Sequence, residues 1–225
     1  MHYDTQNNRH GLRHDPFKAL AVPRPIGWIS TLSADGVRNL APYSFFNAVS
    51  DHPPMVMFSS GGRKDSLANI EATGEFTCSL ATWELRDAMN MSSAPVRRGV
   101  DEFELAGLEA AASRFVKPPR VARSPAAFEC KHWKTVELPA PEGSRSGTHY
   151  SVVFGRVVGV YIDDTVIKDG LVDVGAFRPI ARMGYMDYSV VTPETLFALN
   201  RPLASCWAMC TTSAIRQARK LDTPQ

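Results

Sequence analysis

The chain lacks a strong charge of either sign. Its 225 residues include 25 Lys and Arg against 23 Asp and Glu, a formal net charge of +2. Because nucleic-acid-binding domains usually carry a clustered basic face, we expect no nucleic-acid partner. No apolar run reaches about 18 residues, which argues against a membrane span. The polar N-terminus also lacks the apolar core of a secretory signal, so we expect a cytoplasmic protein without a membrane partner.

Metal-binding and redox patterns of cysteine and histidine are also missing. The four cysteines form no C-x-x-C pair, and only Cys206 and Cys210 share a helical i, i+4 spacing. Ordinary reduced thiols are therefore expected in a cytosolic protein. The six histidines show no tight ligand spacing apart from His10 and His14, which lie in a polar segment. We expect no metal site.

Common nucleotide and hydrolase motifs are absent as well. No G-x-G-x-x-G follows a predicted strand, which excludes the dinucleotide fingerprint. The run Ser60–Ser66 does not have phosphate-loop spacing, because Asp65 separates Lys64 from Ser66. Neither G-x-S-x-G nor H-E-x-x-H occurs. The length allows one large domain and argues against a separate dinucleotide domain beside a substrate domain.

Strand patterns dominate what is present. Asp35-Gly36 lies between two β-rich runs, which predicts an antiparallel hairpin of Trp28–Ser33 and Val37–Tyr43 that continues irregularly into Ser44–Ser50. Further strands are predicted at Met55–Ser60, Glu75–Ala81, Ala126–Leu138 and His149–Asp163, with a turn at Lys168–Gly170. Because no βαβ regularity accompanies them, a closed or partly closed antiparallel barrel with surrounding helices fits best.

Helical patterns are fewer. The run Lys64–Gly74 predicts a helix with Asp65 or Ser66 as its N-cap and Gly74 as its end. Other helical patterns lie at Trp83–Ser93, partly at Phe103–Ala112, and at Pro193–Asn200. Between them, Ala94–Arg123 gives little signal and is a candidate lid. We divide the chain into an N-terminal arm over 1–22, a barrel domain over 23–200 and a tail over 201–225.

One segment has the chemistry of an anion site. After the strand ending in Ser59 and Ser60, a glycine turn leads to Arg63, Lys64 and a helix start near Ser66. The first helix amides lack internal partners, and the helix dipole favours an anion there. Two cations and the serine hydroxyls complete a site for a phosphate without a metal. An ordinary capped helix with two solvated cations is the alternative.

A second segment combines aromatic and polar side chains. Trp28, Tyr43, Phe45 and Phe46 lie near Ser30, Thr31, Ser44 and Asn47 in the predicted hairpin and its continuation. A flat, partly polar ring system requires apolar faces together with donors and acceptors at its edge. The alternative is an aromatic barrel core.

These motifs carry a resemblance to a known family. The runs PRPIGWIST (23–31), NLAPYSFFN (39–47), PPMVMFSSGGRKDSLANI (53–70) and EFTCSL (75–80) resemble the flavin reductase-like family of FMN-binding split barrels. The runs 149–163 and 178–191 are similar to downstream strands of the same family. The resemblance extends in order from Pro23 to Val191.

The resemblance implies a mainly β fold, a Greek-key split β-barrel with peripheral helices, assembled as a homodimer. It also implies FMN held noncovalently near the dimer interface, with NADH or NADPH as reductant. By resemblance, the ring and ribityl chain lie against Trp28, Ser30, Thr31, Ser44, Phe45, Phe46 and Asn47. The phosphate end is formed by Ser59, Arg63, Lys64, Asp65 and Ser66, with Asp65 capping the helix.

The resemblance further places His149 near the nicotinamide, as the candidate catalytic residue, and Arg182, Tyr185 and Tyr188 at the flavin from the partner subunit. No protein nucleophile is required, because the cofactors carry the hydride chemistry. The expected function is NAD(P)H-dependent reduction of flavin for a partner monooxygenase or another acceptor. A flavoredoxin-like electron carrier and a non-enzymatic FMN-binding module are the alternatives.

Overall fold

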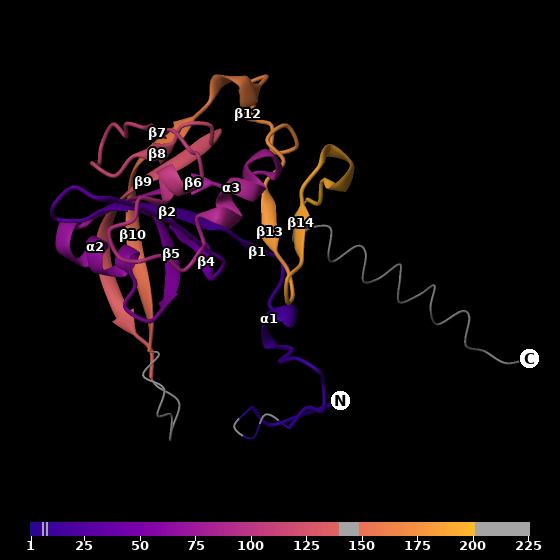
Figure 1. The fold of residues 1–225 in the computed structure, drawn as a ribbon. Coiled ribbons are helices and arrows are strands. Elements are labelled where there is room, and N and C mark those ends of the chain that lie inside the picture. The colour runs from indigo at the N-terminus through magenta and orange to yellow at the C-terminus, as the bar shows by residue number, and fades with distance from the viewer. Residues whose placement is uncertain (6, 8, 140–148, 201–225) are drawn as a thin grey trace, which may run out of the picture. The chain divides into compact units, whose positions relative to one another are not determined.

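The longest strands of the chain pair into one seven-stranded antiparallel sheet (Figure 1). The structure is a computed structural model that describes residues 1–5, 7, 9–139 and 149–200. The strand order is β3-β2-β6-β9-β10-β5-β4. Their bounds are β2 Gly27–Leu32, β3 Arg38–Tyr43, β4 Phe46–Asp51, β5 Pro54–Gly61, β6 Glu75–Leu80, β9 Ala126–Glu137 and β10 Tyr150–Ile162. The prediction of a mainly β fold is confirmed.

The predicted hairpin forms as expected. β2 and β3 pair antiparallel from Gly27 opposite Tyr43 to Leu32 opposite Arg38. At the turn, the Ser33 amide donates to the Val37 carbonyl at 2.9 Å, and Gly36 adopts a positive φ of 83°. The irregular continuation predicted after Tyr43 is strand β4, which pairs with β5.

The sheet curls into a barrel that is split along one seam. The two edge strands, β3 and β4, are joined through only Ser44 and Phe45. Across the interior, the Phe46 ring of β4 lies 2.4 Å from the position that a Cβ on Gly27 of β2 would take, although the two strands are not neighbours in the sheet. One buried cluster joins side chains from both ends of the sheet, including Ile29, Tyr43, Phe58, Phe76 and Val153. The curl therefore brings the interior faces of all parts of the sheet together.

Two glycines allow strand β10 to pass close to aromatic rings on its neighbours. The β9–β10 pairing shifts register at Phe154/Gly155 and again at Val157/Gly159. A Cβ on Gly155 would lie 2.2 Å from the Phe76 ring, and one on Gly159 would lie 2.3 Å from the Phe115 ring. Both distances are well inside van der Waals contact. The Phe76 ring is fully buried, so glycine is required at position 155, whereas the Phe115 ring is 53% exposed and can turn away from a side chain at position 159.

Helix α2 (Asp65–Thr73) matches the predicted helix and ends at Gly74, which has φ 75° and donates to the Ile70 carbonyl at 2.8 Å. The predicted N-cap was wrong by one residue. Lys64 occupies the N-cap position, and no side chain caps the helix. Leu67 and Ile70 are buried in the barrel cluster, as their spacing predicts.

The region after β6 folds into short pieces. The predicted helix over Trp83–Ser93 is a 3-10 turn followed by a short α-helix, and the partly helical pattern over Phe103–Ala112 is one helical turn followed by a two-residue strand. These elements are η1 Trp83–Leu85, α3 Arg86–Met91, α4 Glu102–Leu105, β7 Ala110–Ala111 and β8 Arg120–Val121. They bury a second cluster that includes Trp28, Leu85, Met89 and Phe103.

The remaining elements lie toward the chain ends. A three-stranded sheet has the order β1-β13-β14 and a β11-β12 hairpin forms the predicted turn at Lys168–Gly170. The bounds are α1 Phe17–Leu20, β1 Arg24–Pro25, η2 Asp164–Val166, β11 Ile167–Lys168, β12 Leu171–Val172, β13 Ile180–Arg182, β14 Tyr188–Val190 and η3 Pro193–Thr195. The helix predicted over Pro193–Asn200 was wrong, because only η3 forms there.

The chain divides into two units, Met1–Glu194 and Thr195–Gln225. The arm and barrel predicted over 1–22 and 23–200 both fall mostly within the first unit, and their boundaries stay predictions. The predicted tail over 201–225, with Cys206 and Cys210, lies outside the described residues. No helix in the described part of the chain is long and apolar enough to cross a membrane.

Candidate functional site

A cleft of about 710 Å³ lies where the barrel seam meets the start of α2. The end of β3 and the Ser44–Phe45 link form one side, the end of β5 and the start of α2 form the base, and the segment 92–98 forms the other side. The residues that line it are Lys18, Asn39, Ala41, Pro42, Tyr43, Ser44, Phe45, Ser59, Gly61, Lys64, Asp65, Ser66, Ser92, Ser93, Ala94, Pro95, Val96, Arg98, Glu102 and Tyr150. Six predicted site residues are therefore brought together here: Ser44, Phe45, Ser59, Lys64, Asp65 and Ser66.

The two adjacent cations of the predicted anion site have different surroundings. Lys64 lines the cleft at the N-cap of α2 and forms no ion pair with any described carboxylate. Arg63 does not line the cleft, and its guanidinium pairs with Glu71 about two turns further along the chain, in α2. Of these two adjacent cations, Lys64 therefore adds positive charge to the α2 N-terminus inside the cleft, and Arg63 does not.

Behind the helix start lies a buried polar network. The Ser66 hydroxyl donates to Asn39 Oδ1 at 2.8 Å, and the Thr31 hydroxyl donates to the same oxygen at 3.2 Å. The Asn39 amide donates to both carboxylate oxygens of Glu102 at 3.1 Å, and the Leu40 amide donates to Glu102 at 2.9 Å. Four elements, α2, β2, β3 and α4, are thus fixed to one another directly behind the cleft.

Two buried groups of the cleft have shifted acidities. Burial raises the pKa of Glu102, and this outweighs the hydrogen bonds from Leu40 and Asn39, which act in the opposite direction. Burial likewise raises the pKa of Tyr43. The Tyr43 hydroxyl is buried beside the hydroxyls of Ser60 and Ser66, behind the surface of the cleft.

The aromatic residues also separate into two groups. Phe45 and Tyr150 both line the cleft, with ring centroids 6.3 Å apart. Phe46 instead packs against the barrel core, and Asn47 is exposed and accepts a hydrogen bond from the Ala48 amide. Phe45 therefore belongs to the candidate ring site, and the neighbouring Phe46 belongs to the barrel core.

The residues predicted on β2 do not reach the cleft. Trp28, Ser30 and Thr31 are fully buried and are absent from its lining. The indole N–H of Trp28 donates to the Ser92 hydroxyl at 2.9 Å, and Thr31 belongs to the network behind α2. β2 lies between β3 and β6 with both faces covered, so neither face is open to a ligand.

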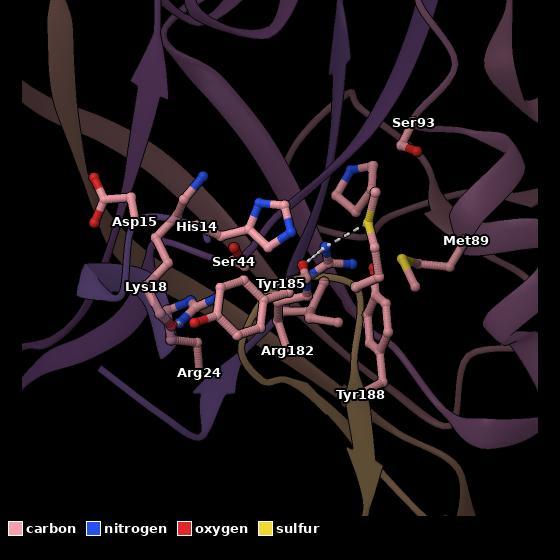
Figure 2. A pocket seen from close by; sticks show the side chains of 13 residues that line it. His14, Asp15, Lys18, Arg24, Ser44, Met89, Ser93, Arg182, Tyr185 and Tyr188 are labelled. Atoms are coloured by element: carbon pink, nitrogen blue, oxygen red, sulfur yellow. Dashed lines mark hydrogen bonds between the residues drawn. The ribbon is translucent and has the colours of Figure 1, made fainter. Parts of the chain in front are cut away.

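The side chains of His149, Arg182 and Tyr185 do not line the cleft itself. His149 is exposed and immediately precedes β10; its carbonyl accepts the Gly62 amide at 2.8 Å, and its side chain lines neither cavity. Arg182 and Tyr185 line a second cavity of about 520 Å³, together with Tyr188 (Figure 2). This cavity shares Lys18, Pro42, Ser44 and Ser93 with the cleft, so both residues approach the cleft from the same chain.

Several residues that line the cleft were not predicted from the sequence. Lys18 comes from the N-terminal segment. Ser92 and Ser93 come from the end of a predicted helix, and Ala94, Pro95, Val96, Arg98 and Glu102 come from the region after it, which has little local pattern. Arg98 reaches Asp65 at the start of α2 with an ion pair of 3.5 Å. Asp65 thus pairs with a cation across the cleft rather than capping its helix. No local sequence signal indicates these long-range contacts.

The arrangement suits a ligand with a flat ring and a phosphate. The start of α2, Lys64 and the Ser59 hydroxyl together favour a phosphate. Beside them, Phe45 and Tyr150 present aromatic rings to the same cleft. No cluster of three or more His, Cys, Asp or Glu in the described residues is arranged to hold a metal ion.

Comparison with known proteins identifies relatives of the chain. The family model for the flavin reductase like domain matches residues 19–181. An uncharacterized protein of Aquifex aeolicus is 39% identical over 171 residues, 73% of this chain and 83% of that protein. Nitrilotriacetate monooxygenase component B from Bacillus cereus is 27% identical with a TM-score of 0.77, over 88% of this chain and 98% of that one. Pseudomonas fluorescens 2-nitrobenzoate 2-nitroreductase is 25% identical with a TM-score of 0.76, over 91% and 100%.

Proposed function

The chain belongs to the flavin reductase-like family, and from this we propose that it binds FMN in the 710 Å³ cleft and reduces it with NADH or NADPH. The observation that carries the proposal is the position of Lys64 at the N-terminus of α2, in a cleft that Phe45 and Tyr150 also line. A dianionic phosphate is the ligand that this position favours most strongly.

In this proposal the chain's own residues bind and orient the flavin. Lys64, the first amides of α2 and the Ser59 hydroxyl hold the phosphate. Phe45 and Tyr150 contact the ring faces. Bound flavin supplies hydride and electron transfer, while the protein supplies position and electrostatic environment.

Trp28, Ser30 and Thr31 act behind the site in this proposal, because they are fully buried. Thr31 supports Asn39, which in turn holds Ser66 at the start of α2. Phe46, Asn47 and Arg63 are left out of the binding set because they do not line the cleft. The same distinction supplies a matched pair of variants for testing the phosphate end.

Two structural neighbours support different acceptors for the electrons of the reduced flavin. The Bacillus cereus neighbour is named as a monooxygenase component, which supports reduced flavin supplied to a partner monooxygenase. The Pseudomonas fluorescens neighbour is named as a nitroreductase, which supports electrons passed to a small molecule at the same site. A flavoredoxin-like carrier that keeps its FMN, or a non-enzymatic FMN-binding module, is the alternative.

His149 remains our candidate for contact with the nicotinamide. It directly precedes Tyr150, which lines the cleft, and it is exposed to an incoming ligand. We expect His149→Ala to raise the KM for NADH or NADPH several-fold while the Kd for FMN stays unchanged. A change in FMN affinity alone would remove His149 from this role.

We extend the proposal to a homodimer on the basis of exposed apolar residues on β9 and β10. Trp133 is 64% exposed and Val160 is 55% exposed, with Phe128 and Val158 also exposed on the same two strands. Large apolar groups on long strands favour a protein interface. Light scattering during gel filtration tests this, and a monomer at micromolar concentration contradicts it.

The phosphate end is tested with two neighbouring lysine and arginine variants. Lys64→Ala removes a cation that lines the cleft, so we expect the Kd for FMN to rise about tenfold, equal to about 1.4 kcal/mol. Arg63→Ala removes a cation that pairs with Glu71, so the Kd should stay within about twofold. Quenching of flavin fluorescence measures both. Equal effects of the two variants would show that the phosphate binds elsewhere.

The reaction is tested separately with the FMN-loaded protein. Stopped-flow absorbance should show flavin bleaching that accelerates with NADH or NADPH. Tight FMN binding without acceleration by either nucleotide would support the carrier or binding-module alternative. A colourless protein that cannot be loaded with FMN would refute all three flavin functions.

A further inference from the structure

The second cavity, of about 520 Å³, is formed by three separate parts of one chain (Figure 2). The N-terminal segment contributes His14, Asp15 and Lys18, β1 contributes Arg24, and the β13–β14 hairpin contributes Arg182, Tyr185 and Tyr188. Through Pro42, Ser44 and Ser93 it continues into the cleft. Its use by a reactant of the flavin rests on the function proposed above.

Positive charge in this cavity is not balanced by the protein. Lys18, Arg24 and Arg182 form no ion pair with any described carboxylate, although the chain forms such pairs elsewhere. The one lining carboxylate, Asp15, accepts a hydrogen bond from the Phe17 amide. An anionic ligand would therefore meet three cations and a single acid.

Arg24 gives the strongest sign of a missing anion. Its side chain is only 9% exposed, and its Nη atoms donate to the carbonyls of Ala21 at 2.7 Å, Met183 at 2.8 Å and Lys18. Carbonyls satisfy these N–H groups without neutralising the charge. The Nε–H is buried and has no partner. A buried guanidinium with a free donor and no counter-ion is costly unless a ligand completes it.

The same cavity presents flat surfaces beside these cations. The Tyr185 ring lies 5.6 Å from the His14 ring, and the Arg182 guanidinium lies 4.5 Å from the centroid of Tyr188. Tyr185 has a positive φ of 53°, a region that bulky residues rarely occupy. Arg182 holds this conformation by donating to the Tyr185 carbonyl. Strain of this kind is often retained where it orients a side chain for a ligand.

We propose that this second cavity binds a planar aromatic ring that carries a carboxylate, with the carboxylate at Lys18 and Arg182 and the ring against Tyr185, while the buried charge of Arg24 adds to the attraction. The cavity volume lies within the range of small-molecule sites, about 300 to 1,000 Å³. The guanidinium fork matches a carboxylate in a bidentate geometry, which favours arginine for this ligand. Because the cavity opens into the cleft, the site selects aromatic acids among the small molecules that reach the flavin.

The test uses benzoate as the probe and two analogues that each lack one feature. Benzamide keeps the ring without the charge, and acetate keeps the charge without the ring. Isothermal titration of the full-length protein, with and without FMN, should give a Kd for benzoate at least about tenfold below the Kd for either analogue. Equal Kd values for benzoate and benzamide, or for benzoate and acetate, would overturn the proposal.

Three variants locate the probe. Lys18→Gln and Arg182→Gln should each raise the Kd for benzoate about fivefold and leave the weaker benzamide Kd unchanged. Arg156→Gln, on β10 and outside both cavities, should leave the benzoate Kd unchanged. Lys18 is exposed and keeps the test valid if the Arg182 variant misfolds. An equal loss in the Arg156 variant would overturn the assignment.

Flavin binding is titrated on the same samples, which separates the two proposals. FMN binding without a benzoate preference would refute the second site and leave the flavin function intact. Benzoate preference without FMN binding would refute the flavin function and leave the aromatic-acid site intact.

Discussion

The two sides of the cleft are built differently. The side behind α2 is a buried network in which Asn39 joins Ser66 to Glu102. The opposite side, residues 93–98, is mostly exposed and reaches α2 only through the ion pair of Arg98 with Asp65. Buried hydrogen bonds cost much to break, whereas exposed ion pairs contribute little. The fold therefore fixes one side of the cleft, whereas displacing the other side costs little free energy.

The exposed side is nevertheless held at both ends. Ser92, before it, accepts the Trp28 indole N–H and donates to the Met89 carbonyl. Glu102, after it, accepts from Asn39 and Leu40. The segment is thus a short span between two buried anchors. We expect its amides to exchange with solvent faster than those of β2 or β3.

The largest effect is expected from removing the centre of the fixed side. Asn39→Ala removes one buried hydrogen-bond partner each from Glu102, Ser66 and Thr31, so we expect a loss of about 3 kcal/mol in the free energy of unfolding. Urea unfolding measures it. Asn47→Ala, at an exposed position, is the control and should stay within about 0.5 kcal/mol. A loss below about 1 kcal/mol for the Asn39 variant would mean that the two sides do not differ as described.

The next effect concerns the Glu102 anchor and depends on pH. At low pH the protonated Glu102 still presents two oxygens to the donors of Asn39 and Leu40. Glutamine replaces one of these oxygens with an NH2 group, which cannot accept, so Glu102→Gln should cost about 1 to 3 kcal/mol there. Burial raises the pKa of Glu102 in the folded state. The folded protein therefore holds this proton more tightly than the unfolded chain, and the associated stability is lost as the pH rises through the folded pKa.

Consequently, the stability advantage of the wild type over Glu102→Gln should shrink between about pH 4 and pH 7, above the ordinary glutamate pKa of about 4.3. Urea unfolding of both proteins across this range measures the difference and cancels the other carboxylates. An advantage that grows with pH would show that hydrogen bonding to the carboxylate outweighs burial.

A smaller effect is expected at the other anchor. Ser92→Ala leaves the buried Trp28 N–H without an acceptor and should cost about 1 to 2 kcal/mol. Ser93→Ala removes an exposed hydroxyl from the neighbouring position and should be close to neutral. Thermal unfolding of the two variants compares them. Equal melting temperatures would remove Ser92 as an anchor.

The smallest effect is expected within the span. Arg98→Gln breaks an exposed ion pair with Asp65, so the free energy of unfolding should change by less than about 0.5 kcal/mol. Arg97→Gln is the matched control, because Arg97 does not line the cleft. A stability loss above about 1 kcal/mol in the Arg98 variant would show that this side is fixed as firmly as the other.

Local patterns predicted the parts of the fold that local interactions decide. Asp35-Gly36 marked the hairpin, and Gly74 marked the end of α2, because both depend on backbone conformations of neighbouring residues. The run Ser59–Ser66 also marked one part of the cleft. It could not show that Lys64 lines the cleft while Arg63 pairs with Glu71, because that depends on a helix orientation set by the barrel.

Long-range packing decided the rest. Trp28 and Ser30 carry suitable chemistry for a ligand, but β2 lies inside the sheet, so both are buried. Lys18, Arg98 and Glu102 reach the cleft from segments without strong periodicity. Their positions follow from contacts across tens of residues, which a pattern in one segment does not encode.

One glycine of β10 sets a limit on how this protein can be altered. Gly155 leaves space for the buried ring of Phe76, so any side chain there would push that ring out of its place in the barrel core. A mutational library aimed at changing what the cleft accepts should keep this codon fixed. Diversity is better directed to the exposed span 93–98, where substitutions meet open solvent and leave the barrel interior untouched.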